Sequence, residues 1–197
     1  MTTSAVTICS NALLMLGDNP ISAFDDDTDR ARLASNLWPM VQDYVLRAHP
    51  WNCAIKRKVL APLEVKPEFD YGAQFLLPDD HLRTLSVGEE GERVRYRMEH
   101  GEQGRVILMD GNACKLRYIW RNDQVDTWDS MLVYAATLSM RAVFAYGVTQ
   151  SASLEQMLQG VLAPVLKQVR AVDGTEDEPE AFDDNPLMQA RLGLGVR

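Results

Sequence analysis

The segment from Pro78 to Arg83, PDDHLR, brings together two carboxylates, an imidazole and a guanidinium. Side chains of these types can act as a general acid and a general base. Adjacent residues of a strand point to opposite faces of a sheet, however, so Asp79, Asp80 and His81 do not converge by themselves. A Pro-Asp-Asp turn that leads into a strand accounts for the same residues. We therefore interpret the segment as a turn.

No other residues have the spacing of a catalytic, metal or cofactor site. The acidic stretch Asp25 to Asp29 lacks the glycine and the glutamate of an EF-hand calcium loop, and acidic residues are common where a helix begins. Cys9, Cys53 and Cys114 are widely spaced, and the histidines are scattered. The sequence has no glycine-rich phosphate loop, Gly-x-Ser-x-Gly elbow or Cys/His nucleophile pair. We expect no catalytic residue, no cofactor and no metal.

Composition indicates a globular chain with one core and a sizeable insertion. The 197 residues are 46% hydrophobic and carry a formal net charge of −8. A protein that clamps nucleic acid needs excess lysine and arginine on its contact face, so the acidic balance argues against that function. The apolar run 131–148 contains Arg141 and is shorter than the roughly 20 residues of a membrane span. The N-terminal segment has no basic n-region, and we expect neither a membrane nor a secretory signal.

Apolar residues recur at helical spacing in four segments, which we predict to be helices. Their N-terminal caps are Ser4 for the first, Asp27 or Thr28 for the second, Asp126 or Asp129 for the third, and Ser151 or Ser153 for the fourth. The predicted apolar face of the fourth helix comprises Leu154, Leu158, Val161, Val165 and Val169. The scarcity of charge in the third helix is typical of the central helix of a bundle.

The apolar period changes to two between Gly72 and Arg121, in ERVRYRME and again in KLRYIWR. Glycine-containing turns separate these runs at hairpin-like intervals. The pattern predicts an antiparallel sheet or small barrel with one apolar face and one strongly basic face. The predicted basic contact face comprises Arg93, Arg95, Arg97, Lys115, Arg117 and Arg121.

The predicted fold class is α+β: a helical bundle with an inserted antiparallel β-sheet or small barrel and an extended C-terminal arm. We assign residues 1–61 and 126–172 to the bundle, 62–125 to the inserted β region, and 173–197 to the acidic arm. The arm holds too little apolar surface to order itself. Its predicted portal or subunit contact residues are Asp173, Glu176, Asp177, Glu178, Glu180, Asp183, Asp184, Leu187 and Met188.

Three interpretations of the basic strand face, together with IKRK at Ile55 to Lys58, stay open. With Trp51 and Tyr118 nearby, the face could bind nucleic acid. It could be a solvated strand face. It could also meet acidic segments of a neighbouring subunit, for which residues 173–184 are an available partner.

Three motifs resemble a known family. They are HPWN at His49 to Asn52 after a long helix, the pattern Tyr-x-x-x-Phe-x-Leu-Pro-x-Asp-x-Leu-Arg at residues 71–83, and an apolar helix after YIWR. In these the chain is similar to the tail tubular protein A family, the head-to-tail adaptors of short-tailed bacteriophages. The resemblance covers nearly the whole chain, but the motifs are structural and name no reaction. Cys53, which follows Trp51-Asn52, departs from the aromatic residues that relatives favour.

The resemblance implies a structural virion protein rather than an enzyme. It implies a homo-oligomeric, dodecameric ring between the portal protein and the tail nozzle protein, with a channel through which DNA passes without specific binding. The localisation implied is the virion tail, after assembly in the host cytoplasm. Two alternatives stay open: a head-completion connector of a longer-tailed phage, and a tail-associated polysaccharide-degrading enzyme. The candidate acids of that enzyme are Glu89, Glu90, Glu92 and Glu99.

Truncation after Gly174 is expected to leave a folded chain that no longer assembles stably with the portal. The four predicted helices keep their own core, whereas the acidic residues and the anchors Leu187 and Met188 are lost. Thermal melting and co-sedimentation with portal complexes measure the two properties separately. Normal portal affinity, or loss of most of the melting temperature, contradicts the prediction.

Overall fold

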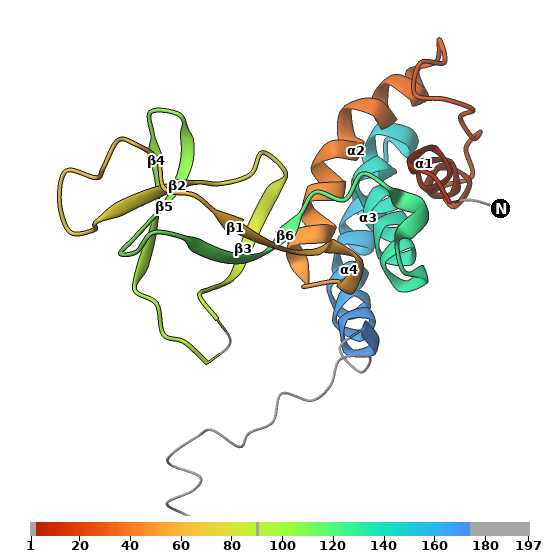
Figure 1. The fold of residues 1–197 in the computed structure, drawn as a ribbon. Helices are drawn as coiled ribbons and strands as arrows, with labels where there is room; N and C mark the ends of the chain where they lie inside the picture. The colour runs from red at the N-terminus through yellow and green to blue at the C-terminus, as the bar shows by residue number, and fades with distance from the viewer. Residues whose placement is uncertain (1–2, 90, 174–197) are drawn as a thin grey trace, which may run out of the picture.

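A computed structural model describes residues 3–89 and 91–173, with side chains described up to residue 167. Over this part of the chain it has an α+β fold with four α-helices and two antiparallel three-stranded sheets, which confirms the predicted class (Figure 1). The helices gather in one lobe and the strands in another. The helices are α1 (Ala5–Leu14), α2 (Asp29–Ala48), α3 (Ser130–Thr149) and α4 (Ala152–Asp173). The strands are β1 (Ile55–Leu60), β2 (Ala73–Leu76), β3 (His81–Val87), β4 (Tyr96–Gly101), β5 (Gly104–Met109) and β6 (Cys114–Trp120).

Each helix begins at a residue that the sequence proposed as its cap. A cap side chain accepts a hydrogen bond from a backbone amide of the first turn, which has no partner within the helix. The cap oxygens and the residues whose amides they accept are Ser4 with Thr7 (3.1 Å), Thr28 with Ala31 (3.1 Å), Asp129 with Met131 (2.7 Å) and Ser151 with Leu154 (3.3 Å). Of the alternatives left open, Thr28, Asp129 and Ser151 are therefore the ones used.

Helix α3 is the centre of the helical lobe, as its low charge predicts, and it packs against α1, α2 and α4. Its side chains are buried around much of its circumference, including Leu132, Met140 and Phe144. By length and composition alone α3 could cross a membrane, but half of its apolar window is buried inside this lobe. In this structure α3 is the core helix of the helical lobe.

The buried face of α4 agrees with the predicted one at Leu154, Leu158 and Val165, which are buried or packed against a core, but not at Val161. Leu158 and Leu166 are buried, whereas Val161, which the prediction placed on the apolar face, is 52% exposed. The buried residues follow the row spaced by four along the helix, and Val161 lies off that row. Val169 lies beyond the described side chains.

The strands form two sheets, with orders β1-β6-β3 and β2-β5-β4. Their apolar faces enclose a second core, to which Leu116 and Tyr118 contribute from the first sheet and Phe75 and Ile107 from the second. Strand β1 begins at Ile55, so the β region starts earlier than the predicted boundary at residue 62. The basic run IKRK, one of whose interpretations is a solvated strand face, lies within this strand.

Strand β6 belongs to both cores. Leu116 and Tyr118 pack in the core between the sheets, whereas Ile119 is fully buried among the helices together with Leu82 of β3. Neighbouring residues of a strand face opposite ways, so Tyr118 and Ile119 can contact different lobes. This strand joins the sheets to the helices.

The substitution Ile119→Ala is expected to lower the free energy of unfolding by about 2–5 kcal/mol, because it leaves a cavity where the lobes meet. The matched control Val59→Ala alters a side chain of β1 that is 64% exposed, and we expect a change of less than about 0.5 kcal/mol. Urea denaturation measures both variants. Equal effects of the two substitutions would contradict the role assigned to Ile119.

Candidate functional site

A groove of about 520 Å³ lies along β1, β6 and the loop that follows β3. Most of its polar lining is charged. The polar residues along it are Arg57, Lys58, Ser86, Glu89, Glu92, Lys115 and Arg117. We call this feature the basic groove.

Arg57 and Arg117 lie directly opposite each other in the pairing of β1 with β6, and Ser86 of β3 lies opposite Arg117 on the other side. Directly paired side chains on antiparallel strands have Cβ atoms about 4.5–5.5 Å apart, and like charges there destabilise the sheet. The Nε atom of Arg117 is buried and makes no hydrogen bond with any described residue. Two cationic side chains thus converge without a counter-charge among the described ion pairs.

The single basic face expected from the sequence is divided between the two sheets. Arg97 lies on β4, with Arg93 and Arg95 in the segment before it, whereas Lys115 and Arg117 lie on β6. The two strands belong to different sheets, so their arginines do not lie on one continuous sheet face. Arg121, the sixth predicted residue, follows β6 and binds Asp43 of α2. The role of the six residues in contacts stays a prediction.

The charges at the rim of the groove are already paired. Lys115 forms an ion pair with Glu89, and the backbone amide of Glu89 donates to the carboxylate of Glu92 at 3.0 Å. The hydrogen bond from Lys115 lowers the pKa of Glu89 and raises the pKa of Lys115. The general acid of a glycoside hydrolase needs a raised pKa, so Glu89 has the opposite electrostatics. Glu99 is exposed on β4, and Glu90 lies outside the described residues.

Asp80 lies just before β3, and two other strands of the same sheet bind its side chain. Lys56 Nζ of β1 lies 2.8 Å from one carboxylate oxygen, and the Tyr118 hydroxyl of β6 donates to the other at 3.0 Å. The ammonium of Lys56 also lies 3.3 Å from the ring centroid of Trp120. Burial acts to raise the pKa of Asp80, but the hydrogen bonds from Lys56 and Tyr118 outweigh it, and the pKa is lowered. Burial and the bond to Asp80 raise the pKa of Tyr118.

His81 is buried beside this carboxylate. Its ring stacks on Tyr118 with centroids 5.5 Å apart, and Nε2 lies 2.9 Å from the hydroxyl of Thr84. Burial lowers its pKa to about 4, and the positive charge of Arg105 acts in the same direction. The imidazole is therefore neutral at neutral pH. The turn predicted for Pro78 to Asp80 is confirmed, but sequence reasoning missed that Asp80 and His81 share Tyr118, because that tyrosine lies far away in the chain.

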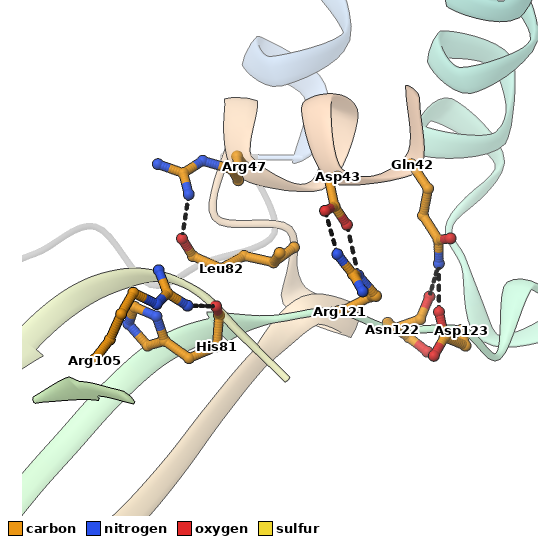
Figure 2. A network of polar contacts seen from close by, with 9 residues as sticks. All are labelled: Gln42, Asp43, Arg47, His81, Leu82, Arg105, Arg121, Asn122 and Asp123. Atoms are coloured by element: carbon orange, nitrogen blue, oxygen red, sulfur yellow. Dashed lines mark hydrogen bonds and ion pairs between the residues drawn. The ribbon is translucent and has the colours of Figure 1, made fainter. Parts of the chain in front are cut away.

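Side-chain hydrogen bonds, some to other side chains and some to backbone carbonyls, connect α2 to the sheet beside this cluster (Figure 2). Arg121 binds both carboxylate oxygens of Asp43, with Nε to Oδ1 at 2.7 Å. The amide of Gln42 donates to the carbonyl of Asn122 at 3.1 Å and to the carboxylate of Asp123 at 2.8 Å. Arg47 of α2 also donates to the carbonyl of Leu82. Arg105 of β5 donates to the carbonyl of His81 in β3, which links the two sheets to each other. Arg121, predicted as a contact residue, therefore serves first as a link between the lobes.

The helices expose apolar side chains that the sequence did not single out. A cleft of about 530 Å³ between α1 and α3 is bordered by Leu14, Met15 and Tyr134. Leu14 is 53% exposed and Tyr134 is 49% exposed. On α2, Met40 and Tyr44 are exposed to a similar degree. Such residues escape periodicity arguments because a helix pattern does not say which of two apolar stripes is covered.

Two further predictions concern residues or ligands beyond these surfaces. The acidic arm lies outside the described residues, apart from Asp173 at the end of α4. Within the described residues, no group of three or more His, Cys, Asp or Glu side chains is placed to hold a metal ion. The candidate sites are the basic groove, the apolar cleft, and the cluster formed by Asp80, Lys56, Tyr118 and His81.

Comparison with known proteins adds no family assignment. No protein-family model matches the chain, and no curated protein matches its sequence. Function is therefore inferred from the contacts and charges of the chain itself, together with the resemblance of its motifs.

The buried imidazole predicts a specific loss of stability in acid. The pKa of His81 is about 4 in the folded chain and about 6.5 when unfolded, so the unfolded state binds more protons between these values. The contribution of neutral His81 to the free energy of unfolding is complete above pH 6.5 and falls by on the order of 3 kcal/mol as the pH drops to 4. His81→Gln, which keeps a partner for Thr84, is expected to flatten this part of the pH dependence. Chemical denaturation at several pH values measures it.

The matched control for this experiment is His100→Gln, which removes an exposed imidazole on β4. It is expected to retain the pH dependence of the unsubstituted chain. A His81→Gln profile parallel to that of the unsubstituted chain would show that the imidazole does not control acid stability.

Proposed function

We propose that this chain is a structural virion protein, an adaptor that forms a ring between the portal and the tail nozzle of a short-tailed bacteriophage. The observation that carries the proposal is the apolar surface of the helical lobe. Leu14, Met15 and Tyr134 border one cleft, while Met40 and Tyr44 are exposed on α2. Contiguous exposed apolar side chains on a folded domain are typical of contacts between proteins. The resemblance of three motifs to those of tail adaptors supports the proposal that these contacts occur in a phage tail.

A ring needs two different patches on each subunit, because a head-to-tail contact closes only when one surface meets another on the next copy. The cleft between α1 and α3 supplies one concave apolar patch, and the exposed side chains of α2 supply candidates for the other. The dodecameric number rests on the resemblance alone. Rigid helices suit this role because they hold the patches in fixed relative positions.

The charges of the chain favour a structural role over catalysis. Glu89, a candidate for polysaccharide cleavage, has a lowered pKa and is paired with Lys115. The net charge of −8 favours a channel through which DNA passes without being bound. We accordingly propose a non-enzymatic protein of the virion tail, with the portal and the nozzle as its partners.

The double substitution Leu14→Asp/Tyr134→Asp is expected to abolish ring formation with purified portal while changing the melting temperature little. Both side chains are about half exposed in the free chain, so charge there costs little until a partner covers it. Sedimentation velocity and electron microscopy of portal mixtures measure assembly. The matched control Val65→Asp/Phe69→Asp places the same charges on exposed apolar residues between β1 and β2.

The control is expected to assemble normally. Rings that persist in the cleft variant, or an unsubstituted chain that remains monomeric with portal and instead depolymerises host-surface polysaccharide, would overturn the proposal.

A further inference from the structure

Four strands of the β region have an open edge, and three of these edges are protected. The sheet orders give β1, β2, β3 and β4 one neighbour each. Strand β1 carries the cationic run 56–58, two register shifts interrupt β3, and Leu63 covers β2 by donating its amide to the Gln74 carbonyl at 2.8 Å. Charge, irregularity and a covering segment each discourage a further strand. Among the described residues, β4 has a regular register and no covering segment.

The pairing of β4 with β5 decides which backbone groups point to the open edge. The amide of Leu77 donates to the carbonyl of Arg105 at 2.9 Å, so the backbone groups of Arg105 in β5 face β2. His100 pairs with Arg105 and therefore turns its own N–H and C=O away from β5. Backbone direction alternates along a strand, so Tyr96 and Met98 do the same. Within the described chain the edge-facing groups of these three residues have no backbone partner.

The side chains along this edge are accessible and carry both signs of charge. The first five residues of β4 are exposed, with Tyr96 at 39% and Met98 at 41%. Arg97 and Glu99 point to the other face of the strand, and neither forms an ion pair among the described residues. The Thr84 hydroxyl of β3 lies 3.6 Å from the Met98 sulfur, but no backbone group of β3 bonds β4.

We propose that β4 pairs with β4 of a second copy of this chain, antiparallel and centred on Met98. In this register Arg97 lies opposite Glu99 of the second copy, and Tyr96 lies opposite His100 of the second copy. The edge-facing residues then meet in hydrogen-bonded pairs. The two pairs of Arg97 with Glu99 occupy the non-hydrogen-bonded positions, where side chains come closest and opposite charges stabilise a sheet.

Charge selects this register over its neighbours. The edge-facing residues must lie opposite each other to exchange hydrogen bonds, so the nearest alternatives are displaced by two residues. One displacement places the two copies of Arg97 opposite each other, and the other does the same with Glu99. Like charges directly opposite each other destabilise a sheet. The edge is therefore complementary to itself, as a contact around a two-fold axis requires.

This contact is separate from the contacts proposed for the ring. Strand β4 lies on the side of the β lobe away from the helices (Figure 1). A two-fold contact closes with two copies, whereas a ring needs a head-to-tail contact between different patches. The proposal concerns the free chain, in which pairing covers an edge that would otherwise favour aggregation. It does not rest on ring formation.

Sedimentation equilibrium of the full-length chain tests the pairing. The contact of one short strand is small, so we expect a weak dimer with a Kd of roughly 10–500 µM. Arg97→Glu and Glu99→Arg each place like charges opposite each other and are expected to raise this Kd about tenfold or more. The matched control Arg93→Glu changes a charge just before β4 and is expected to retain the dimer. An unsubstituted chain that stays monomeric at about 1 mM would overturn the proposal.

A mixture of the two single variants tests the register itself. When Arg97→Glu pairs with Glu99→Arg, each carboxylate meets a guanidinium, so the equimolar mixture is expected to dimerise about as tightly as the unsubstituted chain. The double variant Arg97→Glu/Glu99→Arg restores the same complementarity within one chain and should dimerise as well. Recovery in the mixture also shows that both single variants are folded. Single variants that dimerise normally, or a mixture without recovery, would contradict this register.

Hydrogen exchange, resolved by residue with NMR, identifies the strand. Dimerisation is expected to slow exchange at the amides of Tyr96, Met98 and His100, which are free in the single chain. Met98→Pro removes the central edge-facing N–H without breaking the pairing with β5 and should abolish the dimer. The matched control Met98→Ala keeps that N–H and should weaken the dimer much less. Protection confined to the helical lobe, or a dimer that is lost in Leu14→Asp/Tyr134→Asp, would assign the contact to the apolar cleft instead.

Discussion

The fold depends on one strand that has to satisfy two hydrophobic cores. Strand β6 places Leu116 and Tyr118 between the sheets and, one residue later, Ile119 among the helices. A strand exposed on one face needs apolar residues only at alternate positions, but β6 is covered on both faces where it meets the helical lobe. The apolar contact between the lobes therefore runs through Ile119 of this strand together with Leu82 of β3.

Polar groups around this strand convert apolar contact into a defined orientation. Asp43 binds Arg121 just after β6, and Gln42 binds the two residues that follow. On the other side of the strand, the Tyr118 hydroxyl donates a hydrogen bond to Asp80, and the Tyr118 ring stacks on the ring of His81. Hydrophobic packing tolerates small rotations, whereas hydrogen bonds to buried groups are costly to break. These hydrogen bonds restrict rotation between the lobes, which suits a proposed adaptor that holds its neighbours in fixed positions.

The apolar cleft and the basic groove lie on different lobes. The helices expose apolar side chains around the cleft of Leu14 and Tyr134, whereas the sheet carries the basic groove with Arg57 and Arg117. Apolar contacts supply affinity, and charged contacts govern which partner is met and in what order. The proposed adaptor therefore has an apolar and a charged feature on different lobes.

Local patterns in the sequence determined the α+β class, the helix cap Ser4, and the turn before His81, because each depends on residues within a few positions. Only the tertiary structure decided how the strands pair. It assigned Arg97 and Arg117 to different sheets, brought Arg57 opposite Arg117, and joined Asp80 to Tyr118. Strand pairing links distant segments, and a shift of one residue exchanges the faces of a strand, so alternation reveals that a face exists but not what it meets.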